Sequence, residues 1–142
     1  MSSAIPLPRS PRETMSGWVH LPRFIDKIRL NLVGKLSADY QANLGIKGFD
    51  DRWLKAAGLT APQFIEIVRS SITDGEVCDW IRTNVKRPNE QREFNEYILN
   101  HGRESDPAIR ERLQLRKQQM GLAHRDDIQV FVDFIDADEG RS

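Results

Sequence analysis

The feature that most constrains the fold of this chain is a series of short apolar stripes with helical spacing. The clearest stripe places apolar residues at i, i+3, i+4, i+7 and i+11 between Leu21 and Leu32. This spacing buries one face of a helix, and it predicts a helix over residues 21–33. Pro22 fits the first turn, where its missing N–H is not needed, and Gly34 is expected to end the helix.

Several shorter helices are predicted downstream, each preceded by a residue that can cap its first turn. The residues expected to open these helices are Asp50, Thr60, Thr73, Asp106 and Asp126. Residues 37–48 are expected to form a structured loop. No stretch alternates apolar and polar residues as a strand would, and Ile128–Val132 comes closest. The prediction is therefore an all-α domain, a compact irregular bundle of six or seven mostly short helices.

The N-terminal segment differs from the rest of the chain in its proline content. Three prolines within residues 1–16 predict an extended N-terminal arm, followed by a single helical domain over residues 17–142. A chain of 142 residues is long enough to fold without covalent cross-links. Its only cysteine, Cys78, excludes an internal disulfide and a cysteine-based zinc site. No apolar run approaches the roughly 20 residues of a membrane helix, so a cytoplasmic protein is expected.

The formal net charge is zero, but the two ends of the chain have opposite signs. Residues 1–36 contain six basic and two acidic side chains, whereas residues 126–142 contain six acidic and one basic. One interpretation is that Arg12 and Arg23 pair with the acidic tail at Asp133, Asp136 or Asp138. The alternative is that the two charged segments face a ligand or partner.

The basic N-terminal block is the first candidate binding region. Trp18, His20 and Arg23 lie at the predicted start of a helix, with Arg12 and Glu13 close in sequence. The free N–H groups and dipole of a helix N-terminus favour an anion there. The structural alternative is that Trp18 packs over the beginning of the helix while the arginines pair with the acidic tail.

Metal binding, nucleophilic catalysis and nucleic-acid binding are less well supported by the sequence. The three histidines, His20, His101 and His124, are far apart, and none has the i, i+4 spacing of a helical metal site. Carboxylates spaced by three residues, as in Asp133 and Asp136, suit capping and ion pairing as well as cation binding. No glycine-rich phosphate loop or nucleophile motif is present, and no metal or cofactor is expected. The acids that open the helix after Thr73 argue against nucleic-acid binding.

These observations lead to two functional hypotheses. The first is a helical binding or interaction module with a polar cleft between the N-terminal block and acidic residues. The second is a small enzyme, or an anion- or metal-dependent binder, that uses His20 as acid or base with Asp74, Asp79 or Asp136. The candidate cleft residues are Arg12, Glu13, Trp18, His20, Arg23, Asp74, Asp79, Trp80, Asp133 and Asp136.

The partner is expected to be a protein or a small molecule. An enzyme would need His20 and at least two carboxylates to converge in a partly open pocket, whereas an interaction module would need an exposed apolar or aromatic patch instead, for instance around Tyr40, Phe49 or Tyr97.

Several ordered sequence blocks resemble a known family. They are S-P-R-E at 10–13, G-W-V-H-L-P-R at 17–23, D-Y-Q-A-N-L-G at 39–45, D-G-E-V-C-D-W at 74–80, and the tail over 126–140. The chain resembles a bacterial family of uncharacterised single-domain proteins of about this length, a domain of unknown function. The resemblance implies a bacterial soluble protein that stands alone, and it implies no particular chemistry.

Overall fold

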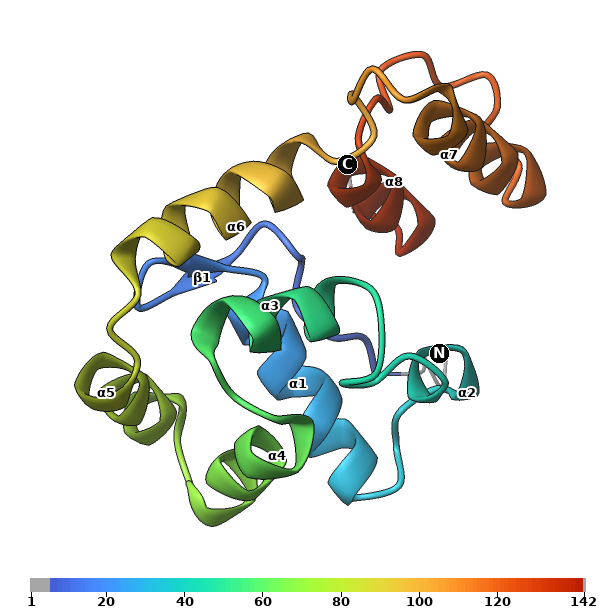
Figure 1. Ribbon diagram of the computed structural model, residues 1–142. Helices are drawn as coiled ribbons and strands as arrows, with labels where there is room; N and C mark the ends of the chain where they lie inside the picture. Colours follow the sequence, from blue (N-terminus) through green and yellow to red (C-terminus); the bar gives the residue numbers. More distant parts are fainter. Residues whose placement is uncertain (1–5, 142) are drawn as a thin grey trace.

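The computed structural model describes residues 6–141, in which eight helices and one short hairpin are formed (Figure 1). The elements are β1 (Thr14–Met15), β2 (Trp18–Val19), α1 (Leu21–Leu32), α2 (Ala38–Gln41), α3 (Phe49–Ala57), α4 (Ala61–Ser70), α5 (Asp74–Asn84), α6 (Pro88–Asn100), α7 (Pro107–Gln119) and α8 (Phe131–Asp138). The predicted all-α class is confirmed. The helix count exceeds the expected six or seven because a single turn, α2, forms within the segment 37–48.

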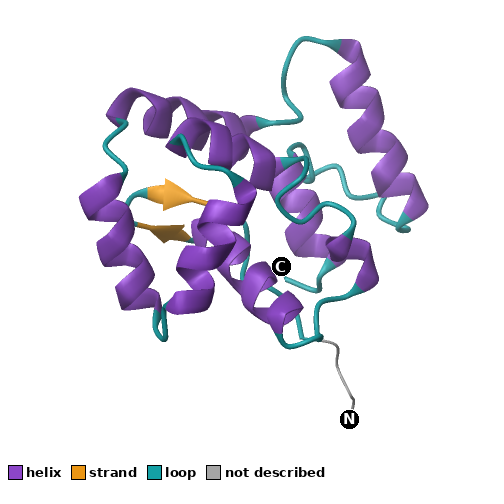
Figure 2. Cartoon of the chain, turned by 60° about the horizontal axis from the view of Figure 1, so that its bottom comes forward, coloured by secondary structure: helices purple, strands orange, loops and turns teal. Residues whose placement is uncertain are grey.

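The prediction that no strand forms was wrong for the hairpin of β1 and β2 (Figure 2). The two strands are antiparallel, with Thr14 opposite Val19. Ser16 and Gly17 connect them, and both have positive φ, 53° and 80°. Two positive φ values in a two-residue loop match the right-handed twist of a tight hairpin. Strands of two residues are too short to show alternation, so only the Ser-Gly turn could have indicated them.

α1 lies at the centre of the larger core, and the helices α3, α4, α5 and α6 surround it (Figure 1). Three aromatic side chains meet there. The ring of Trp53 lies 5.8 Å from that of Phe24 and 4.6 Å from that of Phe64, measured between centroids. Large aromatic side chains that pack at these distances contribute much of the burial that holds such a core together. The hairpin joins this core through Trp18, whose ring is also 5.8 Å from that of Trp53.

Three of the predicted caps are confirmed. Thr60 and Gln63 form a reciprocal capping box at α4. The Thr73 side chain accepts a hydrogen bond from the Glu76 N–H, and that of Asp106 accepts one from the Ala108 N–H. Each bond satisfies a backbone donor that the first helical turn leaves free.

The other two predicted caps, Asp50 and Asp126, were wrong. α3 begins one residue before Asp50, whose carboxylate is buried and bonded to side chains of other segments. α8 begins at Phe131, where the backbone N–H donates to the carbonyl of His101 at 2.8 Å, so Asp126 lies in the preceding loop. In both helices a residue of the first turn makes a contact with a segment distant in sequence.

α7 and α8 form a second, smaller cluster around Leu113, Ile128 and Phe134, and α6 runs between the two clusters (Figure 1). Met120 follows α7 and is 51% exposed. Met120 is the C-terminal cap of α7 and lies beyond its buried face. None of the helices within residues 6–141 combines the length and apolar character needed to cross a bilayer.

Candidate functional site

The N-terminal arm is tied to the C-terminal tail by charged side chains. Arg12 forms ion pairs with Asp133 and, at 3.7 Å, with Asp136. The Ser10 hydroxyl donates to the same Asp136 carboxylate at 3.0 Å. The structure thus brings three of the candidate cleft residues together, and it does so through contacts that neutralise them.

Arg23 makes the most buried of these contacts. Its guanidinium donates to both carboxylate oxygens of Glu139, at 3.0 and 2.7 Å, and to the carbonyl of Arg9 at 3.1 Å. The two charged side chains are only 5% and 3% exposed. The tail partner is therefore Glu139 rather than the residues 133, 136 or 138 considered from sequence. Bidentate arginine–carboxylate geometry of this kind is strong and directional.

Tyr40 also donates its hydroxyl to Glu139. Burial alone would raise the pKa of Glu139, but the hydrogen bonds from Arg23 and Tyr40 outweigh burial and lower it. Burial, followed by the hydrogen bond to Glu139, raises the pKa of Tyr40 to about 12. Glu139 therefore stays ionised and Tyr40 protonated at neutral pH. Both states preserve the contacts among Arg23, Tyr40 and Glu139, which together form a tail clamp.

The remaining candidate carboxylates are dispersed. Asp74 pairs with Arg9 at 2.9 Å and Arg29 at 2.5 Å, so it fastens α5 to the arm and α1. Asp79 forms an exposed pair with Arg82 of its own helix.

Two other candidate residues do not join the arm–tail contacts through their side chains. Trp80 is half-buried against the larger core, and Glu13 is exposed at the start of the hairpin. The ten candidate residues therefore do not converge on one cleft.

His20 belongs to a separate buried network. It precedes α1 in a left-handed conformation, with φ of 76°, and is 2% exposed. Its Nε2 lies 2.7 Å from Oδ1 of Asp50, and the Lys27 ammonium donates to Oδ2 of Asp50 at 2.6 Å. The backbone N–H of Gly45 donates to the same oxygen at 3.2 Å. The network joins α1 to the start of α3.

Burial and charge act on this network in opposite ways. Burial would raise the pKa of Asp50, but the hydrogen bond from His20 and the charge of Lys27 lower it to about 2. Burial lowers the pKa of His20. This effect outweighs the hydrogen bond and the charge of Asp50, which both act to raise it. The folded protein therefore holds an ionised Asp50 beside a neutral His20. This arrangement suits a structural link better than proton transfer with a substrate.

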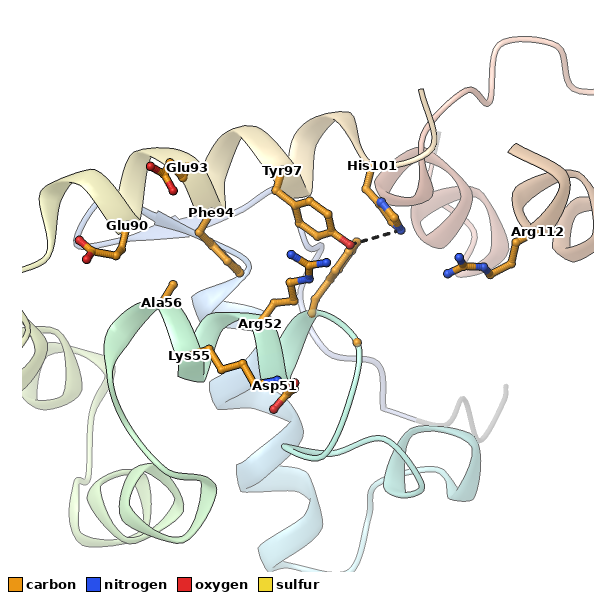
Figure 3. A pocket seen from close by; sticks show the side chains of 12 residues that line it. Asp51, Arg52, Lys55, Ala56, Glu90, Glu93, Phe94, Tyr97, His101 and Arg112 are labelled. Carbon is orange, nitrogen blue, oxygen red and sulfur yellow. Dashed lines mark hydrogen bonds and ion pairs between the residues drawn. The ribbon is translucent and has the colours of Figure 1, made fainter. Parts of the chain in front are cut away.

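A cavity of about 730 Å³ lies on the other side of α3, between α3 and α6 (Figure 3). α7 contributes Arg112 at one end, and Glu90 and Glu93 lie toward the other end. Phe49, Tyr97 and His101 form an aromatic wall between them. Unlike the arm–tail region, this cavity is open and combines apolar surface with charged side chains, as ligand sites commonly do.

Arg52 is the most unusual side chain in this cavity. Its guanidinium lies over the ring of Tyr97, 3.9 Å from the centroid (Figure 3). Among residues 6–141, no carboxylate lies within ion-pair distance of Arg52 or of Arg112. The third cation in the cavity, Lys55, pairs with Asp51 at 2.9 Å. Two positive charges thus face the cavity without a described counter-ion.

His101 is held in place at the α7 end of the cavity. Its Nδ1 lies 2.7 Å from Glu104, and its ring stacks on Phe131 with centroids 4.9 Å apart. The other ring nitrogen lies 3.4 Å from the Tyr97 hydroxyl. Burial raises the pKa of Tyr97, so its hydroxyl stays protonated at neutral pH. The cavity therefore presents a fixed imidazole and a phenol to any molecule that enters it.

Sequence reasoning identified part of this cavity and missed the rest. Tyr40, Phe49 and Tyr97 were named as possible places for an exposed aromatic patch. Phe49 and Tyr97 are half-buried and line the cavity, whereas Tyr40 contacts Glu139. Arg52, His101 and Arg112 were missed as binding residues because each lies on a different helix or helix end. The only available signal was that Arg52 and Phe49 share one short helix opened by glycine.

In the described part of the chain, no group of three or more histidine, cysteine or acidic side chains is placed to hold a metal ion. Comparison with curated proteins finds no match. A family model described as a domain of unknown function, DUF5069, matches residues 5–141. The match spans nearly the whole chain, and the chain therefore belongs to the DUF5069 family.

Proposed function

We propose that this protein is a helical binding module and that its ligand is a small organic anion held in the cavity between α3, α6 and α7. The single observation that carries the proposal is Arg52, a guanidinium stacked on Tyr97 at 3.9 Å with no carboxylate partner among the described residues. A planar guanidinium fixed by an aromatic ring keeps its N–H donors aimed and loses little freedom when an anion binds.

The contrast with the arginines that hold the arm and the tail supports this assignment. Every arginine that joins the arm or the tail to the rest of the molecule already has an acidic partner. These residues are Arg9, Arg12, Arg23, Arg29 and Arg141. An anion in the polar cleft expected from sequence would have to displace those carboxylates. An anion at Arg52 and Arg112 would displace only water.

The size and lining of the cavity indicate the class of ligand. Ligand pockets commonly enclose about 300–1,000 Å³, and the value of about 730 Å³ lies within that range. Phe49 and Tyr97 offer apolar surface for a ring or short chain. Glu90 and Glu93 at the far end disfavour a second negative group there. The ligand class is therefore a carboxylate or phosphate monoester with one anionic end and an apolar body.

Catalysis in the same cavity is the second candidate function, favoured by one observation. Glu104 holds Nδ1 of His101 at 2.7 Å, which leaves the other nitrogen facing Tyr97 and the cavity. A histidine oriented by a carboxylate is a common general base. The test is whether a bound ligand is converted over hours by the wild-type protein, followed by NMR. His101→Gln would retain binding and abolish conversion.

The binding proposal is tested by isothermal titration and thermal shift with a panel of aromatic carboxylates and phosphate monoesters. A ligand present at a hundred times its Kd stabilises the folded state by about 2.7 kcal/mol. Arg52→Gln and Arg112→Gln each remove a charge-assisted hydrogen bond, so each is expected to weaken binding about tenfold or more.

Arg82→Gln is the matched control, because Arg82 is exposed on α5 and pairs only with Asp79. It is expected to bind like the wild type. The proposal fails if no compound in the panel binds. It also fails if the Arg82 variant loses as much affinity as the Arg52 and Arg112 variants.

A further inference from the structure

We propose a second site, formed by Lys117, Arg103 and Arg110 beside α7, that binds a phosphoryl group. The site is separate from the α3–α6–α7 cavity and does not depend on the function proposed for it. It lies in a hollow of about 430 Å³ between α7 and the loop that leads to α8.

Lys117 is the residue that points to a ligand. It is 2% exposed, although it carries an ammonium group. Its Nζ donates one hydrogen bond, to the carbonyl of Ile128 at 3.2 Å. Among residues 6–141 no carboxylate lies within ion-pair distance of this nitrogen. An ammonium has three donors, so two of them are left for another acceptor.

The other buried lysine of the chain shows what such a group ordinarily requires. Lys27 is 7% exposed, and its Nζ lies 2.6 Å from the Asp50 carboxylate. A buried charge without a counter-ion costs several kcal/mol unless the environment supplies one. Lys27 has that partner within the fold, whereas no described carboxylate lies within ion-pair distance of Lys117. Asp127 is the nearby acid, and the charge of Lys117 contributes to lowering its pKa. An anion in the hollow would supply it.

The hollow is positively charged overall. Lys117, Arg103 and Arg110 line it, and Asp126 is the one acidic residue among its lining residues. Neither arginine has an ion-pair partner within the described chain. Gln114 and Gln129 add neutral polar groups to the wall. The site thus offers an excess of two positive charges to a compact anion.

This charge selects the class of ligand. A phosphoryl group carries about −1.5 to −2 at neutral pH and presents three acceptor oxygens, whereas a carboxylate carries a single charge. The two exposed guanidinium groups can bind oxygens with paired donors, and the buried ammonium of Lys117, which also lines the hollow, acts as a point charge. Inorganic phosphate and a small phosphate monoester share this chemistry.

The test measures thermal stability and binding heat with inorganic phosphate, glycerol phosphate and acetate as probes. The wild type is expected to melt higher with millimolar phosphate or glycerol phosphate and to respond little to acetate. The tighter of the two phosphorylated probes tells whether the free anion or a monoester is preferred. Arg110→Gln is expected to weaken phosphate binding about tenfold.

Lys117→Met keeps the long apolar stem and removes the charge. It is expected to melt at the same temperature as the wild type or higher in the absence of phosphate, and to lose the phosphate response. Arg82→Gln is the control, because Arg82 is exposed on α5, pairs with Asp79 and lines neither cavity. It is expected to keep the full phosphate response. If Lys117→Met does not fold, Arg103→Gln and Arg110→Gln carry the test.

Two results would overturn the proposal. The first is a wild type that responds to neither phosphorylated probe. The second is a phosphate response that is equally strong in the Lys117, Arg103 and Arg110 variants. Arg103→Gln and Arg110→Gln affect only this site, and Arg52→Gln affects only the α3–α6–α7 cavity, so failure here and failure of the proposed function are distinguishable.

Discussion

Replacing Asp50 with Asn is expected to destabilise this fold more than a typical polar substitution. Asp50 is 1% exposed and is shared by the Lys27 ammonium, the His20 ring and the Gly45 backbone N–H. Asn occupies nearly the same volume but carries no charge. The substitution therefore leaves Lys27, which is 7% exposed, as a buried cation without its counter-ion.

The size of the effect can be worked out from this geometry. Removing one partner of a buried ion pair costs roughly 3–5 kcal/mol. A chain of this length has a free energy of unfolding on the order of 7–20 kcal/mol, so the loss is a large share of it. At about 3 °C per kcal/mol, the Tm is expected to fall by about 10 °C.

Urea unfolding at neutral pH, followed by circular dichroism, measures this change. The midpoint is expected to move while the m-value stays constant. Lys27→Met combined with Asp50→Asn is expected to recover part of the loss, because the stranded charge is then gone. A cost below about 1 kcal/mol for Asp50→Asn, or strict additivity in the double variant, would refute the reasoning.

Three further predictions concern pH, the tail clamp and the α7–α8 junction. Because the folded-state pKa of His20 lies below the ordinary histidine value of 6.5, the unfolded chain takes up a proton first as pH falls. Stability present above pH 6.5 is thus lost below it, and His20→Gln should flatten this decline in urea midpoints; an unchanged slope would contradict the assignment. Glu139→Gln breaks the buried pair with Arg23 and is expected to cost roughly 3–5 kcal/mol in urea unfolding, so a cost near zero would show that this pair contributes little. Gly102 has φ of +119°, and an added Cβ would lie 2.9 Å from Cα of Val130, so Gly102→Ala should lower the Tm by several degrees; an unchanged Tm would mean that this junction can relax.

Much of the fold could be predicted from local sequence signals. The apolar stripe between Leu21 and Leu32 predicts a helix over residues 21–33, one residue longer than α1 in the structure. The capping box at Thr60 and Gln63 fixes the start of α4, because both partners lie within four residues of each other. Such features depend on neighbours along the chain, and the sequence displays them directly.

The features that sequence did not predict depend on contacts between distant segments. Asp50 is a residue type that commonly caps helices. Its carboxylate is instead buried and hydrogen-bonded to a histidine 30 residues earlier and a lysine 23 residues earlier. The cavity joins Arg52, Tyr97 and Arg112 from three helices, and no local pattern links them. Charge asymmetry indicated that arm and tail could pair, but not that Glu139 would be the partner of Arg23.

The most direct test of the central claim observes the two cavity arginines themselves. Two-dimensional NMR of the arginine side-chain Nε–H groups, recorded during titration with the tightest compound of the panel, reports on each guanidinium separately. The Arg52 and Arg112 signals are expected to shift together with a single Kd, while the paired signal of Arg23 stays in place. Shifts confined to arginines outside the cavity, or an Arg52 signal that does not move at saturation, would contradict the assignment of this cavity as the binding site.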